Sequence, residues 1–407
     1  MSVRGDRLKA SVIVPTYNRC DLLHETLRQL TRQRSQPGEF EVIVSDDGSS
    51  DETKAVVESF ADKLLLKYHF QEDLGFRAGT ARNAGARLAT APVLVFLDSG
   101  AMASPDYLRH HLAAHGDDAD HRAVCGYMYG FNPFASVPGL GAALSRFHPE
   151  EVLAQYDDNA AFLDVRHGDL IKCGFELTRL SVPWMLFFTA NCSVRAADFW
   201  DTGGFDEEFT GWGAEDLEFA FRFFRRGFSF HFTQAAWTIE APVERDMDTR
   251  MKEFSSNMRK FLGKYPEPVV EIGWALVRKN RMFDWEDDYR NLQAWSLEVR
   301  DLNVADEVDE AMQRIPRDDR IAVLGAGRNV PAARPATILV DFDKELLDQG
   351  QGAGPHLRHH AVGLRTPLAD QSVDTVIITS RLAGLRDRWN DDLMTEAHRI
   401  GRKVYTP

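Results

Sequence analysis

Short β-branched runs alternate with helical patterns over the N-terminal quarter of the chain, and no other pattern restricts the possible folds as strongly. The run SVIV (11–14) precedes a stretch whose leucines fall on one helical face (22–30), and EVIV (41–44), KLLLKYHF (63–70) and PVLVFLDSG (92–100) repeat the strand signal. Strands at this spacing predict a mostly parallel α/β sheet. Ligands of such sheets bind at the carboxyl ends of the strands, which here read PTYNR, SDDGS and LDSG.

The composition argues against several classes of protein. A chain of 407 residues predicts one large domain with an appendage. The net charge of −14 and the pI of 5.4 argue against nucleic-acid and membrane partners, which select clustered basic residues. The 4 cysteines form no CxxC pair, so neither a zinc site nor a disulfide framework is predicted. Without a signal peptide or a run of about 18 apolar residues, we expect a soluble cytoplasmic protein.

The sequence pattern changes twice along the chain. Residues 120–188 mix glycine, proline and aromatic residues irregularly, and a helical, highly charged stretch follows from 245. A second α/β pattern begins at 320. We therefore predict a large domain (1–245), a helical extension (246–316) and a small C-terminal α/β module (317–407).

Acidic side chains stand at two of the predicted strand ends. Asp46 and Asp47 follow one strand, and Asp98 ends another. Carboxylates that converge at one sheet edge repel one another unless a cation or a donor group joins them, so a divalent ion or a nucleobase is suggested. Each aspartate taken alone also suits a helix cap or a turn.

A set of motifs follows in one order along the chain: VIVPTYNR, DDGSSDET, GTARNAGARLA, FLDSG, TANCSV, GGFDEEF and GWGAED. In this order and spacing the set resembles the GT-A-fold glycosyltransferases of family 2. The last segment resembles one shared by galactosyltransferases and polypeptide N-acetylgalactosaminyltransferases. The resemblance covers about residues 10–245 and implies a Rossmann-like mixed sheet that binds a nucleotide sugar, with a UDP-sugar expected. Residues 120–188 would then form the acceptor side.

The resemblance also implies individual donor-site residues. Those that would line the nucleotide pocket are Pro15, Thr16, Tyr17, Arg19, Asp46 and Asp47. Asp47 would accept the uracil N3–H, and Arg82 would lie near the diphosphate. Asn191 would contact the donor sugar or would be a buried structural amide.

A metal site is implied by the same resemblance. The family holds Mn²⁺ or Mg²⁺ at a strand-end Asp-x-Asp signature, so Asp98 takes that role here, and the ion acts as a Lewis acid on the leaving diphosphate. The third position of the signature is Gly100, which has no ligand. In the polypeptide-transferase relatives a further metal-binding histidine follows the tryptophan motif. The residue at the same separation from Trp212 in this chain is Glu240, which we take as the candidate ligand, with His231 as a less favoured alternative. Glu240 equally suits a salt-bridged surface residue.

The segment GWGAED supplies the expected catalytic carboxylates. A neutral acceptor hydroxyl needs a general base to displace a nucleoside diphosphate, and a carboxylate at a helix start stays ionised. In related inverting enzymes the second acid is the base, which implies Asp216, with Glu215 positioning a sugar and Trp212 as a stacking wall. Alternatively the two acids only cap the helix, which leaves Gly211 and Gly213 unexplained.

Three histidines and the C-terminal segment are interpreted as structural features rather than as parts of the transfer site. His110, His111 and His115 share a predicted helix without an acidic partner, which favours a solvated helix face over a metal site. The C-terminal segments VLGAGR, VDFDKELLD, PLADQSVDTVIITS and MTEAHRIGRKVY resemble the first strands of a class I methyltransferase, in which Asp341 or Asp343 would hold S-adenosylmethionine. We expect a truncated relic or docking module there, because a lone glycine-rich loop is a weak signal.

Together these features predict a metal-dependent, inverting glycosyltransferase that moves a sugar from a nucleotide sugar to a hydroxyl of a soluble acceptor. A small natural product such as an aminocyclitol is expected, and a glycan or protein acceptor is the alternative. A sugar nucleotidyltransferase would need a glycine-rich basic loop, which PTYNRCDLL lacks. A non-catalytic sugar-nucleotide-binding scaffold would have no use for the acids of GWGAED. Whether the chain forms a homo-oligomer stays open.

Overall fold

The computed structural model describes residues 8–35, 38–117, 120–132, 135–156, 158–244, 246–328, 337–349 and 356–406.

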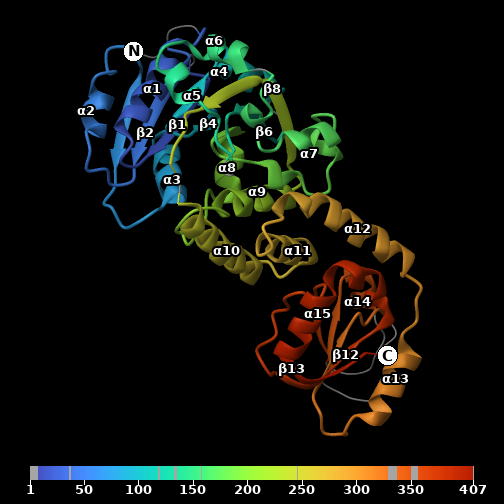
Figure 1. The fold of residues 1–407 in the computed structure, drawn as a ribbon. Coiled ribbons are helices and arrows are strands. Elements are labelled where there is room, and N and C mark those ends of the chain that lie inside the picture. The colour runs from blue at the N-terminus through green and yellow to red at the C-terminus, as the bar shows by residue number, and fades with distance from the viewer. Residues whose placement is uncertain are drawn as a thin grey trace. The chain divides into compact units, whose positions relative to one another are not determined.

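The chain divides into two compact units, Met1–Asn257 and Met258–Pro407, which Figure 1 colours from blue to olive and from olive to red. The sequence predicted boundaries at 245 and 316. The structural division differs because the predicted helical extension buries apolar side chains, among them Val308 and Met312, in one core with the C-terminal sheet. Among the described residues, no helix has the length and the apolar composition needed to cross a membrane.

The first unit contains a mixed sheet of 8 strands in the order β3-β2-β1-β4-β7-β6-β8-β5. Its strands are β1 (Ala10–Thr16), β2 (Phe40–Asp46), β3 (Leu66–Phe70), β4 (Val93–Leu97), β5 (Ala101–Ala103), β6 (Arg122–Tyr129), β7 (Asn191–Arg195) and β8 (Ser229–Glu240). Strands β1 to β4 are parallel, whereas β7 runs antiparallel to β4 and β6, and β5 antiparallel to β8. The predicted mixed α/β sheet is therefore confirmed.

Helices cover this sheet and connect its strands (Figure 1). They are α1 (Cys20–Leu30), α2 (Thr53–Glu58), α3 (Ala78–Leu88), α4 (Tyr107–Ala114), α5 (Leu140–Leu144), α6 (Pro149–Tyr156), η2 (Ala160–Phe162), α7 (His167–Lys172), η3 (Leu177–Arg179), η4 (Pro183–Leu186), α8 (Ala196–Thr202), α9 (Glu215–Arg225) and the start of α10 (Met247–Lys264). The valines and isoleucines of β1 and β2 are fully buried, which is typical of parallel strands covered on both faces.

The irregular 120–188 segment is organised by a buried ion pair that its sequence does not announce. Asp164 and Arg166 are both fully buried, and their closest atoms are 2.6 Å apart. The Arg166 guanidinium also donates to the carbonyl oxygens of Leu186 and Gly126, at 2.8 Å each. A guanidinium with this many partners ties strand β6 and the η4 turn to the segment around Asp164.

The histidines of α4 correct one prediction. His111 and His115 are buried, and each has a ring nitrogen within 2.9 Å of the Ser193 hydroxyl oxygen. Burial lowers the pKa of His111 to about 4 and that of His115 to about 3, so both are neutral at pH 7. The expected solvated face was wrong because these side chains pack against β7.

The second unit contains a parallel sheet of 5 strands in the order β11-β10-β9-β12-β13. Its elements are α11 (Pro268–Val277), η5 (Met282–Asp284), α12 (Trp285–Glu298), α13 (Ala305–Arg314), β9 (Ile321–Leu324), β10 (Ile338–Asp341), α14 (Lys344–Gln349), β11 (Leu357–His360), β12 (Val373–Ile378), η6 (Ser380–Leu385), α15 (Arg386–Ile400) and β13 (Gly401–Tyr405). This strand order is that of doubly wound α/β folds, and the predicted small α/β module is confirmed.

Glu271 joins helix α11 to a loop of the second unit, residues 362–365. Its buried carboxylate accepts hydrogen bonds from successive backbone N–H groups over residues 362–365. A carboxylate that satisfies a run of backbone donors fixes both the helix and the loop. The packing of α11 against this loop thus has a specific polar contact as well as apolar burial.

Candidate active site

A single buried arginine joins the acidic residues that the sequence places far apart. Arg82 on α3 is 4% exposed, and its Nη1 lies 3.0 Å from Glu215 Oε1 at the start of α9. Its Nη2 lies 3.0 Å from Asp98 Oδ1, directly after β4. Burial opposes its charge, yet the carboxylates of Asp98 and Glu215 raise the pKa of Arg82 above its usual range. The sequence placed Arg82 near a diphosphate, but its terminal nitrogens are bonded to protein carboxylates.

Two oxygen atoms of this cluster are left for a ligand. Glu215 Oε2 is buried and has no hydrogen-bond partner among the described residues. The Asp98 side chain is 35% exposed, and no bond to its second oxygen is recorded within the described residues. A buried acceptor without a partner costs free energy, which a substrate hydroxyl or a cation would recover.

Asp216 adds a further carboxylate beside the pair. Its Oδ1 accepts a hydrogen bond from the Leu217 backbone N–H at 2.8 Å, which orients the side chain. Burial, and then the neighbouring Glu215 carboxylate, raise the pKa of Asp216 above its usual range, against the lowering effect of Arg82. One arginine thus faces three carboxylates, and the cluster carries excess negative charge.

The conformation of the GWGAED loop explains its glycines. Gly211, Gly213 and Ala214 have φ angles of +79°, +86° and +71°, in the left-handed region that glycine tolerates best. A Cβ atom on Gly213 would lie 2.9 Å from the Phe254 ring of α10. The two glycines therefore serve the turn and its close packing.

Helix α10 contacts this loop through residues that no motif marked. Glu253 accepts the Trp212 backbone N–H at 2.9 Å, and Asn257 donates to the Gly213 carbonyl oxygen at 2.8 Å. The Trp212 and Phe254 rings meet edge to face, with centroids 5.8 Å apart. The sequence reasoning missed these residues because they lie in a charged helix with no local signature.

The two aspartates after β2 already have partners. Asp46 accepts two backbone N–H groups of the following turn and the Tyr68 hydroxyl, at 2.6 Å. Asp47 accepts the Gln71 amide at 2.5 Å and the Arg77 backbone N–H at 2.8 Å. Asp46 is therefore a turn residue, whereas a uracil contact at Asp47 stays a prediction.

The residues after β1 lie beside those aspartates. Pro15 and Thr16 are in register with the last residues of β2. Thr16 Oγ1 is buried without a hydrogen-bond partner among the described residues. Tyr17 is 43% exposed and donates to Asp73 at 2.8 Å, and Arg19 precedes the first turn of α1. The structure thus brings these four predicted residues to one edge of the sheet.

Asn191 is in register with Leu97 at the end of β4, but its side chain lies in the core. It is fully buried, its amide donates to the carbonyl oxygens of Tyr127 and Ala236, and its Oδ1 meets a ring nitrogen of His111 at 2.9 Å. Of the two expected roles the structure shows the buried amide. A donor-sugar contact is wrong because every amide position is taken inside the core.

The predicted metal ligands follow β4 and end β8, two strands that are not adjacent in the sheet. Glu240 is in register with Ala101, just beyond Asp98, and is buried rather than on the surface. His231 lies at the opposite end of β8, which removes it as an alternative ligand. Within the described ranges, no group of three or more His, Cys, Asp or Glu side chains is placed to hold an ion. Mg²⁺ often binds through one or two carboxylates with phosphate and water, so a metal site at Asp98 and Glu240 stays a prediction.

The glycine-rich loop of the second unit is filled by protein. Arg381 and Asp341 are both fully buried and bonded at 3.1 Å, and the Gly327 N–H donates to Asp341 Oδ2 at 2.7 Å. A Cβ atom on Gly327 would lie 3.1 Å from the Arg381 side chain. Asp343 accepts the Leu346 N–H at the start of α14. Asp341 is thus taken up by protein groups, and the expected truncated relic or docking module stays a prediction.

Comparison with known proteins gives consistent matches. The model of glycosyl transferase family 2 matches residues 11–162, and that of the N-terminal domain of galactosyltransferase matches residues 170–244. Validoxylamine A glucosyltransferases from Streptomyces hygroscopicus subsp. limoneus and subsp. jinggangensis are each 40% identical over an alignment of 406 residues. The alignments cover 98% of this chain and 90% and 96% of the relatives. A crystal structure of S. aureus TarS 1–349 with UDP-GlcNAc aligns at a TM-score of 0.47 and 21% identity, over 76% of this chain and 82% of that one.

These matches confirm the predicted family and the predicted class of enzyme, whereas the individual site residues stay predictions. The match to family 2 and the full-length likeness to characterised transferases agree with the mixed sheet of the first unit. The chain belongs to glycosyl transferase family 2 and is a GT-A-fold glycosyltransferase.

Proposed function

We propose that the chain moves a hexosyl group, glucose in the first instance, from a UDP-sugar to a hydroxyl of an aminocyclitol natural product such as validoxylamine A, with inversion. Support comes from the 40% identity, over 98% of the chain, to two enzymes named validoxylamine A glucosyltransferase. The structural observation that carries the proposal is the buried Arg82, bonded to Asp98 and Glu215 beside Asp216.

In the proposed reaction Asp216 takes the proton of the acceptor hydroxyl while the acceptor oxygen bonds to the anomeric carbon of the donor. The bond from that carbon to the diphosphate oxygen breaks, and UDP leaves with the electron pair. A single displacement of this kind inverts the anomeric configuration. The raised pKa of Asp216 suits the role, because a carboxylate of higher pKa is the stronger base.

Arg82 and Glu215 act by position in this proposal. Arg82 neutralises part of the carboxylate cluster and holds Glu215 through Oε1. The second Glu215 oxygen, which lacks a partner among the described residues, accepts a hydrogen bond from a sugar hydroxyl. Burial makes such a bond strong and selective, because no water competes for the same oxygen.

The donor nucleotide lies along the edge formed by the ends of β1 and β2. Thr16 Oγ1 and the exposed Tyr17 ring face it, Arg19 lies beside them, and Trp212 forms a wall on the sugar side. A bound Mn²⁺ or Mg²⁺, held by Asp98 and Glu240, would supply Lewis-acid stabilisation of the leaving diphosphate.

A transfer assay tests the proposal. The purified chain is incubated with validoxylamine A and UDP-, GDP- or dTDP-glucose, each with Mn²⁺, Mg²⁺ or EDTA, and the product is weighed by mass spectrometry. We expect a product one hexose heavier from UDP-glucose with a divalent ion. The anomeric proton coupling of the product reports inversion.

Other outcomes separate the alternatives. Transfer to a glycan or a protein, but not to validoxylamine A, would show that the acceptor belongs to another class of molecule. If no donor is consumed and Asp216→Asn binds UDP-glucose as the wild type does, the chain is a sugar-nucleotide-binding scaffold.

A further inference from the structure

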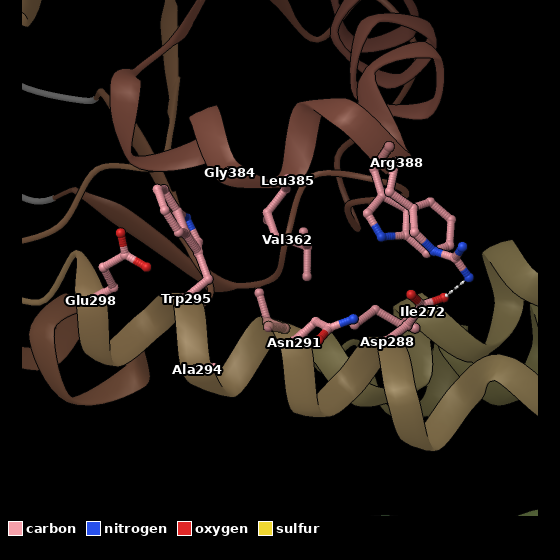
Figure 2. A pocket seen from close by; sticks show the side chains of 12 residues that line it. Ile272, Asp288, Asn291, Ala294, Trp295, Glu298, Val362, Gly384, Leu385 and Arg388 are labelled. Carbon is pink, nitrogen blue, oxygen red and sulfur yellow. Dashed lines mark hydrogen bonds and ion pairs between the residues drawn. The ribbon is translucent and has the colours of Figure 1, made fainter.

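The second unit contains a groove that the glycosyl transfer site does not use. It has a volume of about 300 Å³ and lies between helix α12 on one side and η6 with the start of α15 on the other (Figure 2). Apolar side chains from α11 and from the loop before β12, including Ile272 and Val362, contribute to its lining. This volume is at the lower end of sites that hold small molecules.

Helix α12 presents a polar and aromatic stripe to the groove. Asp288, Asn291, Trp295 and Glu298 follow one another at intervals of three or four residues, so they share one helical face. Figure 2 shows all four along the groove, opposite Leu385. A helix face that only packs against protein is expected to be apolar, so this stripe is unusual for a purely structural contact.

The Trp295 indole is held in one orientation. Its Nε1 donates to the Arg381 carbonyl oxygen at 2.7 Å. A Cβ atom on Gly384 would lie 2.5 Å from the ring, so the indole packs directly on the glycine backbone. The side chain is nevertheless only half-buried. A fixed, partly exposed indole binds a ring ligand without losing further side-chain entropy.

The charges of the groove select against anions. Asp288 is paired with Arg388, as the dashed line in Figure 2 marks, so these two charges cancel. Glu298 is exposed and forms no ion pair within the described part of the chain. The remaining charge is negative, which disfavours a nucleotide or phosphate ligand and favours a cation beside the indole.

We propose that this α12 groove is a second, non-catalytic binding site for a small polyhydroxylated amine. The apolar face of the ligand ring lies on Trp295, its protonated nitrogen pairs with Glu298, and Asn291 bonds its hydroxyls as both donor and acceptor. The ligand class is that of the acceptor in the proposed function, on which the choice of probe rests. The second unit would thereby hold acceptor apart from the transfer site.

Titration calorimetry of validoxylamine A into the full chain, without nucleotide sugar, tests the site. We expect binding to the wild type and about two- to fivefold weaker binding to Glu298→Gln, because Glu298 is exposed and water screens its charge. Asp287→Asn is the matched control, since it removes the same charge from an exposed position of α12 outside the groove. It should bind as the wild type does. myo-Inositol, which has the hydroxyls but no amine, should bind more weakly and with little dependence on Glu298.

Unchanged binding to Glu298→Gln, an equal loss in Asp287→Asn, or no binding to the wild type would each overturn the groove site. A transfer assay on the same preparations reports on the proposed function separately. Glu298→Gln should retain the wild-type kcat at saturating acceptor, and absence of transfer by every chain would count against the function and leave the groove result standing.

Discussion

The two units each bury an arginine against carboxylates at the edge of a parallel set of strands, yet only one of these centres is open. Arg381 and Asp341 are both 0% exposed, and Asp341 is further bonded by the backbone of Gly327. In the first unit Asp98 is 35% exposed beside Arg82, and Glu215 keeps a buried oxygen without a partner among the described residues.

The two centres differ in the balance of their charges and in their exposure to solvent. In the second unit one arginine meets one carboxylate, so no charge remains and the glycine-rich loop is filled. In the first unit one arginine meets three carboxylates, counting Asp216, so a surplus of negative charge remains. The same ion-pair chemistry therefore gives a closed, neutral centre in one unit and a partly exposed, charged centre in the other.

Removing the proposed base tests the open centre most severely. Asp216→Asn should lower kcat about 10²- to 10⁴-fold, because the acceptor proton then has no general base, while the fold is kept. Steady-state kinetics with circular dichroism as a check on folding measures it. Asp201→Asn, an exposed aspartate on α8, is the control and should change kcat less than twofold. A near-normal kcat in Asp216→Asn would remove it as the base.

Replacing each arginine compares the two centres directly. Arg381→Leu leaves a fully buried carboxylate and should destabilise the second unit by about 3–5 kcal/mol. Arg82→Leu leaves the buried Glu215 carboxylate unpaired, while water screens Asp98, so it should destabilise the first unit as well and abolish transfer. Hydrogen exchange resolved by peptide reports each unit by itself.

The double variant Arg381→Leu with Asp341→Leu is the control for that comparison. Removing both partners of a buried pair is close to neutral, so most of the lost stability should return. If it does not return, the space filled by Arg381, rather than its charge, holds the loop.

The contacts of α10 with the GWGAED loop should have a smaller effect. Asn257→Ala leaves the Gly213 carbonyl oxygen without this donor and should destabilise the loop by about 1–3 kcal/mol. Because the loop carries Glu215 and Asp216, kcat should fall more than the acceptor KM changes. Asp248→Asn, exposed on the first turn of the same helix, is the matched control. Equal effects of the two variants would argue against a positioning role for Asn257.

The pH dependence of kcat/KM should report the raised pKa of Asp216. Burial and Glu215 raise the pKa of Asp216, and the base works only when it is ionised. On acidification kcat/KM should therefore begin to fall at a higher pH than it would with an ordinary aspartate, whose pKa is about 4. Below that pKa the fall should approach about tenfold per pH unit. A flat profile down to pH 5 would show that the base is not perturbed.

Local sequence determined much of the fold. The run SVIV and the leucines after it specify β1 and α1, because strand and helix periodicities depend on neighbouring residues alone. The motif set likewise indicated the family, and the acids of GWGAED were named as site residues before their geometry was known.

The contacts that decide between roles came only from the tertiary structure. Asp46, Asp98 and Asp341 each end or follow a strand, and nothing in the sequence tells a turn residue from an open ligand or a closed ion pair. Their partners Tyr68, Arg82 and Arg381 are distant along the chain, so the charge balance and burial of each aspartate exist only once the strands are side by side.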